Sequence, residues 1–230
     1  QGVNILINLF FGVALNAARG IASQVESAVM LFVRNFTTAL NPQITKYYAN
    51  GDKENMFLLM CRGTKFTYFL TLLMVLPLFL ETEYVLQLWL KEVPTHTVIF
   101  VQLSIIGSII NNIGNTCYTA CQATGNIKRY SIVVTTVGFL VFPLTWLGFK
   151  LGLPVESTYI IYILVYICVS IACMLMTRWL LQFPLSMFLR KALLPIVWVT
   201  ILSSIIPTLL SLRMESSFVR FIITCMVSVL

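Results

Sequence analysis

Ionisable side chains occur inside an apolar stretch near the N-terminus, between residues 17 and 40. Arg19, Glu26 and Arg34 are separated by seven and eight residues, and Ser23 and Ser27 lie between them. At about 100° per residue, these five side chains share an arc of roughly 100° on one helix face. An ionisable residue within a membrane span costs about 2.5 kcal/mol or more, so it usually faces protein or water. The spacing therefore predicts a polar stripe that lines a water-filled cavity.

The charges of this stripe indicate which ligand it would accept. Two arginines against one glutamate would attract an anion, and the planar guanidinium group suits a phosphate. Glu26 lies about 14 Å along the helix, near the midplane of a bilayer. Its carboxylate is expected to be either the counter-ion of Arg19 or a cation-coupling site. The alternative is that Arg19 extends toward the outer membrane surface and pairs with Glu26, seven residues away.

A second polar stripe occurs between residues 97 and 123. Its side chains also fall within an arc of about 100°. Such residues either line a cavity or form hydrogen bonds between neighbouring spans. The next two apolar stretches carry almost nothing comparable, with Thr135, Thr136 and Ser170 inside otherwise apolar sequence, and they are expected to face lipid or pack against other helices. The second stripe consists of Ser104, Ser108, Asn111, Asn112, Asn115, Thr119 and Gln122.

Residues suited to catalysis or metal binding are few. The acidic pairs Glu81 with Glu83 and Asp52 with Glu54 are expected in loops, and His96, the single histidine, lies beside a loop. No set of nucleophile, base and acid can be assembled around it. The six cysteines have no metal-binding spacing. We therefore expect no enzyme activity, no cofactor and no metal site.

The composition determines the elements that must hold these residues. Of the 230 residues, 59% are hydrophobic and only 10% are charged, with a mean hydropathy of +0.91. A soluble domain needs roughly a quarter charged residues to cover its surface. The sequence therefore predicts an all-α integral membrane protein, a polytopic helical bundle in one domain. Apolar stretches of spanning or partial length cover residues 1–12, 17–40, 64–80, 97–123, 131–149, 157–177, 192–210 and 217–230.

The basic residues predict the orientation of these spans. Nine of the fifteen lysines and arginines flank the loops around Asn50, Gly125 and Gln182, and four flank those around Glu83, Gly152 and Met214. Because lysine and arginine accumulate in cytoplasmic loops, the first group is predicted to be cytoplasmic. The net charge of +7 is thereby explained by topology and lipid contact, so no nucleic-acid partner is expected.

Four segments of the chain resemble a known family. They are NILINLFFG at 4–12, LNAARGIASQV at 15–25, FTTALNPQITKYYANGD at 36–52 and CQATGNIKRY at 121–130. These segments are similar to the polysaccharide-transporter branch of the multidrug/oligosaccharidyl-lipid/polysaccharide flippase superfamily, the O-antigen flippase type. The resemblance extends over nearly the whole chain and is strongest from Asn4 to Asp52.

This resemblance implies a fold and a function. The chain would be the C-terminal part of a 12- or 14-helix flippase in the bacterial inner membrane, a V-shaped pair of bundles around a central cavity. By alternating access, it would move a polyprenyl-pyrophosphate-linked oligosaccharide, an O-antigen or capsule repeat unit. Its partners would be this lipid-linked substrate and membrane lipid, with polysaccharide polymerase and glycosyltransferases as candidate protein partners. The chain begins at Gln1 and stops at Leu230 inside apolar stretches, so it is also expected to be cut from a longer polypeptide at both ends.

The resemblance also implies roles for individual residues. Arg19 and Arg34 would hold the pyrophosphate, with Glu26 beside them in the cavity. Sugar hydroxyls would meet the side-chain amides of Asn8, Gln24, Asn111, Asn112 and Asn115. In this family reading, the NPQITKYYANGD segment is a cytoplasmic connection in which the helix ends near Pro42.

Three other functions are compatible with parts of the sequence. Cation-coupled multidrug extrusion would require several membrane carboxylates, whereas Glu26 is the single one found within the predicted spans. A polyprenyl-phosphate glycosyltransferase would require clustered carboxylates. A structural membrane subunit would bury both polar stripes between helices, out of reach of water.

Overall fold

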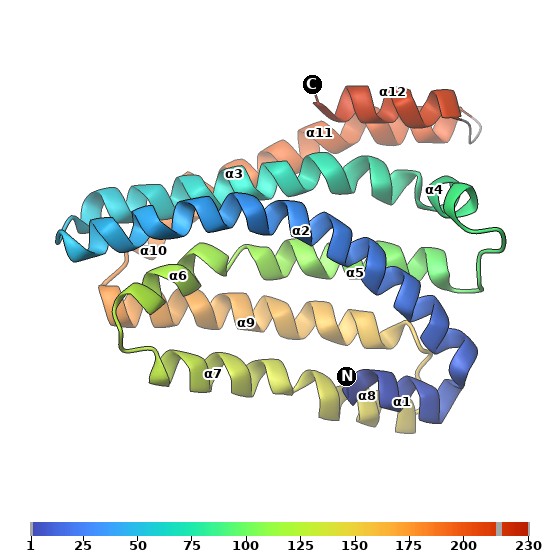
Figure 1. The fold of residues 1–230 in the computed structure, drawn as a ribbon, viewed down its shortest axis with the longest axis horizontal. Helices are drawn as coiled ribbons and strands as arrows, with labels where there is room; N and C mark the ends of the chain where they lie inside the picture. Colours follow the sequence, from blue (N-terminus) through green and yellow to red (C-terminus); the bar gives the residue numbers. More distant parts are fainter. Residues whose placement is uncertain (1, 215–217, 230) are drawn as a thin grey trace.

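The computed structural model describes residues 2–214 and 218–229. These residues form helices joined by loops, and they contain no strand (Figure 1). Gln1, Ser217 and Leu230, which belong to the first and last predicted stretches, lie outside the described residues. The helices are α1 (Gly2–Phe11), α2 (Val13–Ala49), α3 (Lys53–Leu80), α4 (Thr82–Trp89), α5 (Thr97–Asn112), α6 (Asn115–Ala123), α7 (Lys128–Phe139), α8 (Val141–Lys150), α9 (Ser157–Leu181), α10 (Leu185–Phe188), the π-helical turn η1 (Leu189–Leu193), α11 (Leu194–Arg213) and α12 (Phe218–Val229).

Within residues 2–214 and 218–229, five helical segments are long and apolar enough to cross a membrane. They are Lys53–Leu80, Thr97–Ala123, Lys128–Lys150, Ser157–Leu181 and Leu185–Ser211, and they contain the predicted stretches from 64–80 to 192–210. Many of their large apolar side chains are exposed, as expected for a surface in contact with lipid. The prediction of an all-α polytopic membrane bundle is confirmed.

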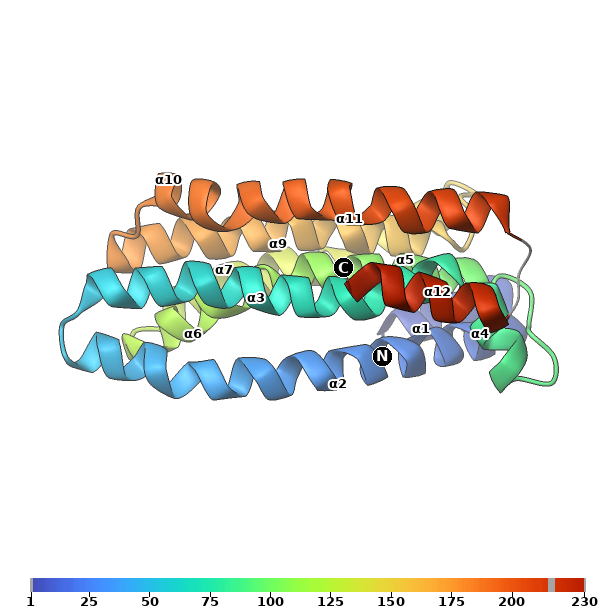
Figure 2. The same cartoon turned by 90° about the horizontal axis from the view of Figure 1, so that it is seen from above.

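The long helices lie side by side along one common direction (Figures 1 and 2). The α2–α3, α6–α7 and α9–α10 connections lie at one end of the bundle, and the α4–α5 and α8–α9 connections lie at the other, together with the last turn of α11 and the first turn of α12 (Figure 1). The loops around Asn50, Gly125 and Gln182 therefore share one end. This arrangement agrees with the alternation that the basic residues predict.

Helix α2 is longer than the apolar stretch at 17–40, because hydropathy marks the membrane-embedded part and the helix extends beyond it. The expected helix end near Pro42 is wrong: α2 continues through Pro42 to Ala49. Proline removes one backbone hydrogen bond, and packing of α2 against α3 and α6 compensates for that loss. The turn at Asn50 and Gly51 is present, and the Asp52 side chain accepts a hydrogen bond from the Asn55 amide (3.1 Å) at the start of α3.

Three of these five long segments are interrupted. The segment Thr97–Ala123 breaks at Ile113 and Gly114 between α5 and α6. The segment Lys128–Lys150 breaks at Leu140, one turn before Pro143, whose nitrogen cannot donate to the preceding turn. The π-helical turn η1 similarly precedes Pro195. The backbone polar groups freed at these breaks must be satisfied inside the protein.

Close packing of α5 on α9 depends on Gly107. A Cβ atom placed there would lie 2.8 Å from the Tyr162 ring, whereas a Cβ atom at Gly20, also helical, would meet nothing within 4 Å. We therefore expect opposite effects from one substitution: Gly107→Ala destabilises the protein by about 1 kcal/mol or more, and Gly20→Ala stabilises it by about 0.5–1 kcal/mol. Thermal unfolding of both variants in one detergent tests this, and equal shifts of the same sign would contradict the packing argument.

A buried ion pair connects α12 to the end of α3. Arg220 Nη2 donates to Glu81 Oε2 at 2.7 Å, and Glu81 is 1% exposed. Arg220 also donates to the backbone carbonyls of Ser211 and Met214 near the end of α11. One guanidinium group therefore ties three helices together at this end of the bundle.

Candidate functional site

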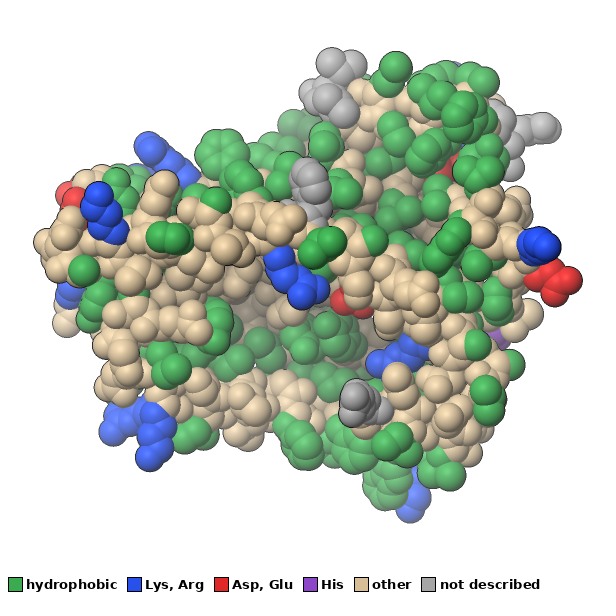
Figure 3. Space-filling view, in the orientation of Figure 1, with side chains coloured by type: hydrophobic (Ala, Val, Ile, Leu, Met, Phe, Trp, Pro, Cys, Tyr) green, Lys and Arg blue, Asp and Glu red, His purple; other side chains and the backbone are tan. Residues whose placement is uncertain are grey.

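A polar cavity lies inside the bundle, among α2, α5, α6, α7 and α9. Its volume is about 380 Å³. The face shown in Figure 3 is hollowed between α2 and α7, with basic and acidic side chains at the edge of the hollow. The lining residues are Glu26, Met30, Val33, Arg34, Ser108, Asn111, Asn112, Gly114, Asn115, Tyr118, Tyr130, Val134, Val169, Ser170 and Cys173.

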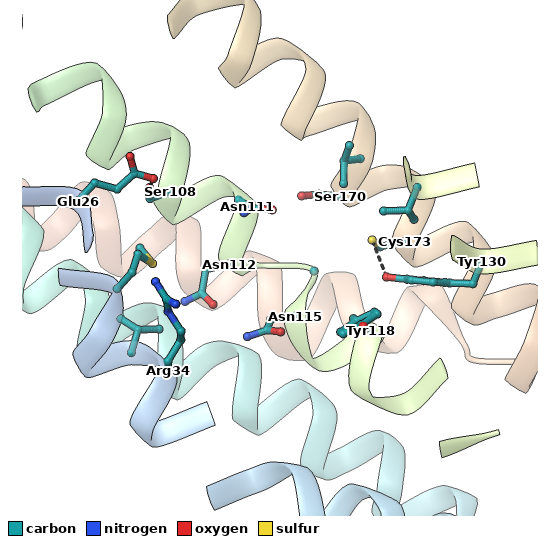
Figure 4. Close-up of a pocket in the computed structure, with 15 residues that line it drawn as sticks. Glu26, Arg34, Ser108, Asn111, Asn112, Asn115, Tyr118, Tyr130, Ser170 and Cys173 are labelled. Atoms are coloured by element: carbon teal, nitrogen blue, oxygen red, sulfur yellow. Dashed lines mark hydrogen bonds between the residues drawn. The ribbon is translucent and has the colours of Figure 1, made fainter. Parts of the chain in front are cut away.

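Helix α2 contributes both charged residues of this cavity. Glu26 is half-buried and accepts a hydrogen bond from the Ser108 hydroxyl on α5 (2.5 Å). Arg34, two turns further along α2, is exposed, and its side chain extends into the same space as Asn112 and Asn115 (Figure 4). The carboxylate is thus held in place by a neighbouring helix, whereas the guanidinium group can meet a ligand.

The second polar stripe supplies a row of amides, and the break between α5 and α6 shapes it. Asn111 and Asn112 end α5, and Asn115 begins α6, whose N-terminus has no side-chain cap. The Asn112 amide donates to the Thr71 hydroxyl of α3 at 3.4 Å. The three asparagines and Gly114 all line the cavity. Amide groups and free backbone N–H groups can donate to hydroxyl or phosphate oxygens of a ligand.

Helix α9 forms much of the opposite wall, so the expectation that the sixth apolar stretch only faces lipid or packs is wrong. Ser170 and Cys173 of α9 line this cavity, and Tyr159, Tyr162 and Tyr166 line a second chamber beside it; these five residues are three or four positions apart and so share one helix face. This spacing was the sequence signal that could have indicated an inward-facing side of α9. It was missed because tyrosine and cysteine do not stand out in an apolar sequence. From α7, the buried Tyr130 forms a hydrogen bond with the Cys173 sulfur (2.9 Å).

A second chamber of about 280 Å³ adjoins the cavity, and Glu26 lines both. Arg19, Ser23, Ser104, Thr158 and Tyr159 are among its polar lining residues. The Tyr159 hydroxyl and the Arg19 guanidinium group are close enough to interact. Within residues 2–214 and 218–229, however, Arg19 Nη1, Tyr159 OH and Thr158 Oγ1 are buried without a hydrogen bond of good geometry. Because buried polar groups normally have partners, this chamber is suited to a polar ligand or water.

The structure brings most of the predicted site residues together. Glu26, Arg34, Asn111, Asn112 and Asn115 line the larger cavity, and Arg19 lines the second chamber. The other two residues, Asn8 on α1 and Gln24 on α2, are exposed and line neither space. The helical arc used for the prediction placed Arg19 and Arg34 on one face but did not include Gln24.

Part of the polar stripes connects helices instead. The Thr119 hydroxyl on α6 donates to the Asn41 side chain on α2 (2.9 Å), and the Thr64 and Thr116 hydroxyls form a hydrogen bond between α3 and α6 (2.5 Å). These pairs lie beyond the cavity, toward the end where α2 meets α3. The second stripe therefore has a cavity-lining part and, at Thr119, a helix-packing part.

Water access to the cavity can be tested with introduced cysteines. In a protein whose native cysteines are replaced, Asn111→Cys, exposed in the cavity, should react with a membrane-impermeant maleimide. It should react about ten times faster than Val29→Cys, because a thiolate forms where water reaches the sulfur. Val29 is 5% exposed and lies on the same helix as Glu26 without lining the cavity. Equal, slow labelling at both positions would favour a sealed polar core.

Comparison of the chain with models of protein families, with curated proteins and with solved structures found no match.

Proposed function

We propose that the protein is a flippase that moves a polyprenyl-pyrophosphate-linked oligosaccharide across a bacterial inner membrane by alternating access. The observation that carries this proposal is the amide-lined cavity that contains Arg34 within a membrane-spanning bundle. The resemblance of the segments at 4–12, 15–25, 36–52 and 121–130 to O-antigen flippases supplies the substrate class. Neither argument requires bond making or breaking, so the protein's work is binding and conformational change.

The chemistry of the larger cavity suits the polar part of such a substrate. A guanidinium group binds phosphate with two parallel hydrogen bonds, and Arg34 is available for this because it is exposed. Asn111, Asn112 and Asn115 carry both donors and acceptors, which match sugar hydroxyls in either orientation. Tyr118 adds an exposed aromatic ring against which a sugar can pack. The pyrophosphate would thus bind near Arg34 and the first sugars near the asparagines.

The second chamber supplies another cationic position further along the path. Arg19 and Arg34 lie fifteen residues apart on α2, which is about 22 Å along the helix axis. Arg34 lies toward the end with the predicted cytoplasmic loops, and Arg19 lies toward the opposite end. In this proposal, the pyrophosphate contacts Arg34 first and Arg19 later. Glu26 stands between the two positions and disfavours an anion that stops midway.

The position of Glu26 also favours a second candidate function, cation-coupled multidrug extrusion. Glu26 borders both spaces and is held by Ser108, an arrangement in which a carboxylate could bind a proton or a sodium ion. The two arginines that share its helix face disfavour a cationic drug. The flippase therefore accounts for more of the lining residues.

Complementation tests the proposal. The parent protein, which carries no substitution, is expressed in a bacterial host that lacks its own O-antigen flippase. Surface polysaccharide is then measured on gels and by antibody. Restoration by the parent, and none by the empty vector, supports the flippase. If the parent fails with several repeat-unit structures but lowers drug accumulation, and Glu26→Gln abolishes that effect, the extrusion function replaces it.

A further inference from the structure

A groove separate from the larger cavity lies between α7 and α9, on the outside of the bundle. Arg129, Ile132, Val133, Met176 and Trp179 line it, and its volume is about 270 Å³. It is found near the end of the bundle that carries the loops around Gly125 and Gln182 (Figure 1). Neither Arg129 nor Trp179 lines the larger cavity or the second chamber.

The groove has a cationic mouth and an apolar body. The Arg129 guanidinium carbon lies 5.1 Å from the centre of the Trp179 ring, a distance at which the ring and the cation attract each other. Ile132 lies one turn after Arg129 on α7, and Met176 lies one turn before Trp179 on α9. Both are therefore deeper in the membrane than the charged mouth. Trp179 itself is 53% exposed, as is usual for tryptophan at a membrane interface.

The positive charge at the mouth is not neutralised by the protein. In the part of the chain that the structure describes, no carboxylate lies within 4 Å of Arg129. Lys128 and Arg178, the next basic residues on α7 and α9, are exposed as well. The N-terminus of α7 has no side-chain cap, so its first amide groups add further positive potential.

We propose that this groove binds an anionic phospholipid. Its phosphate contacts the Arg129 guanidinium group, and an acyl chain follows Ile132, Val133 and Met176. Charge complementarity selects the headgroup, since a choline lipid brings its own cation to the same place. A groove of about 290 Å³ between α8 and α9 provides a comparison, because its lining contains no charged residue. This groove lies on the outside of the helical bundle, so the lipid-binding proposal does not depend on the proposed flippase function.

Quenching of Trp179 fluorescence by brominated lipids tests the proposal. Every tryptophan except Trp179 is replaced by phenylalanine; in this chain these are Trp89, Trp146 and Trp198, which are all exposed by 40% or more. The protein is reconstituted in vesicles of phosphatidylglycerol and phosphatidylcholine, with bromine on one lipid or the other. From the quenching, the anionic lipid should bind beside Trp179 about five-fold more tightly than the choline lipid.

Two variants separate a specific site from general surface charge. Arg129→Gln should abolish the preference for the anionic lipid over the choline lipid, so that the ratio of the two affinities falls to about one. Lys53→Gln, which removes an exposed basic residue at the same end of the bundle, should leave this preference unchanged. The elution profile and thermal unfolding of each variant show whether it is folded. Equal quenching by both lipids in the protein that retains Arg129 overturns the proposal. A preference that survives Arg129→Gln in a folded variant overturns it too.

Discussion

Replacing Arg34 by alanine is expected to reduce surface polysaccharide in the complementation assay by about ten-fold or more, at matched membrane expression. A charge-assisted hydrogen bond is worth about 1.5–3 kcal/mol, and about 1.4 kcal/mol corresponds to one factor of ten. Arg34 faces the cavity without a salt bridge in the part of the chain described, so its loss removes binding without leaving a buried charge. Arg34→Lys should keep part of the activity, because it retains the charge but loses the planar fork.

The same assay applies to Arg19→Ala, for which a comparable loss is expected. Arg62→Ala is the matched control, because Arg62 is an exposed arginine of α3 that lines neither space. Normal polysaccharide from Arg34→Ala and Arg19→Ala would mean that the arginines serve packing or topology. A loss in all three variants would point to total charge as the cause.

Replacing Arg220 by alanine is expected to have the largest effect on stability. It would leave the Glu81 carboxylate, 1% exposed, without its cation, and breaking a buried ion pair in this way costs about 3–5 kcal/mol. The expected result is a marked fall in the unfolding temperature of the detergent-solubilised protein. Arg213→Ala, which removes an exposed arginine from the end of α11, should change this temperature little.

A double substitution refines this prediction. Glu81→Leu combined with Arg220→Leu should recover much of the lost stability, because replacing both partners of a buried pair by apolar groups is often neutral. If Arg220→Ala and Arg213→Ala unfold at the same temperature, the contact between α12 and α3 does not contribute to the fold.

The class of fold could be predicted because it depends on quantities that are summed over many residues. Spans of about 20 apolar residues are required by the thickness of the bilayer, and the five apolar segments follow the predicted stretches. Interruptions inside a span depend on a few residues and could not be predicted in the same way. The break at Ile113 and Gly114 falls between asparagines that had been read as one continuous stripe.

The candidate site could be predicted where polarity stands out against an apolar background. Arg19, Glu26, Arg34 and the asparagines were found on that basis. The contribution of α9 was missed, because Tyr159, Tyr162 and Tyr166 are aromatic and are counted with the hydrophobic residues, although each carries a hydroxyl. Asn8 and Gln24 were assigned from the family resemblance, but the position of a side chain around its helix axis decides whether it enters a cavity, and both of these side chains are exposed outside the two spaces.

The polarity of α2 also has a consequence for biogenesis. Although α2 is the longest helix described, it is absent from the five apolar segments, and it carries Arg19, Glu26 and Arg34 into the bilayer. Such a helix partitions poorly from the translocon into lipid by itself. Because α2 packs extensively against α3 and α5, we expect it to leave the translocon together with these later helices. The residues that equip this helix for a ligand thus make its own insertion depend on neighbours that are synthesised after it.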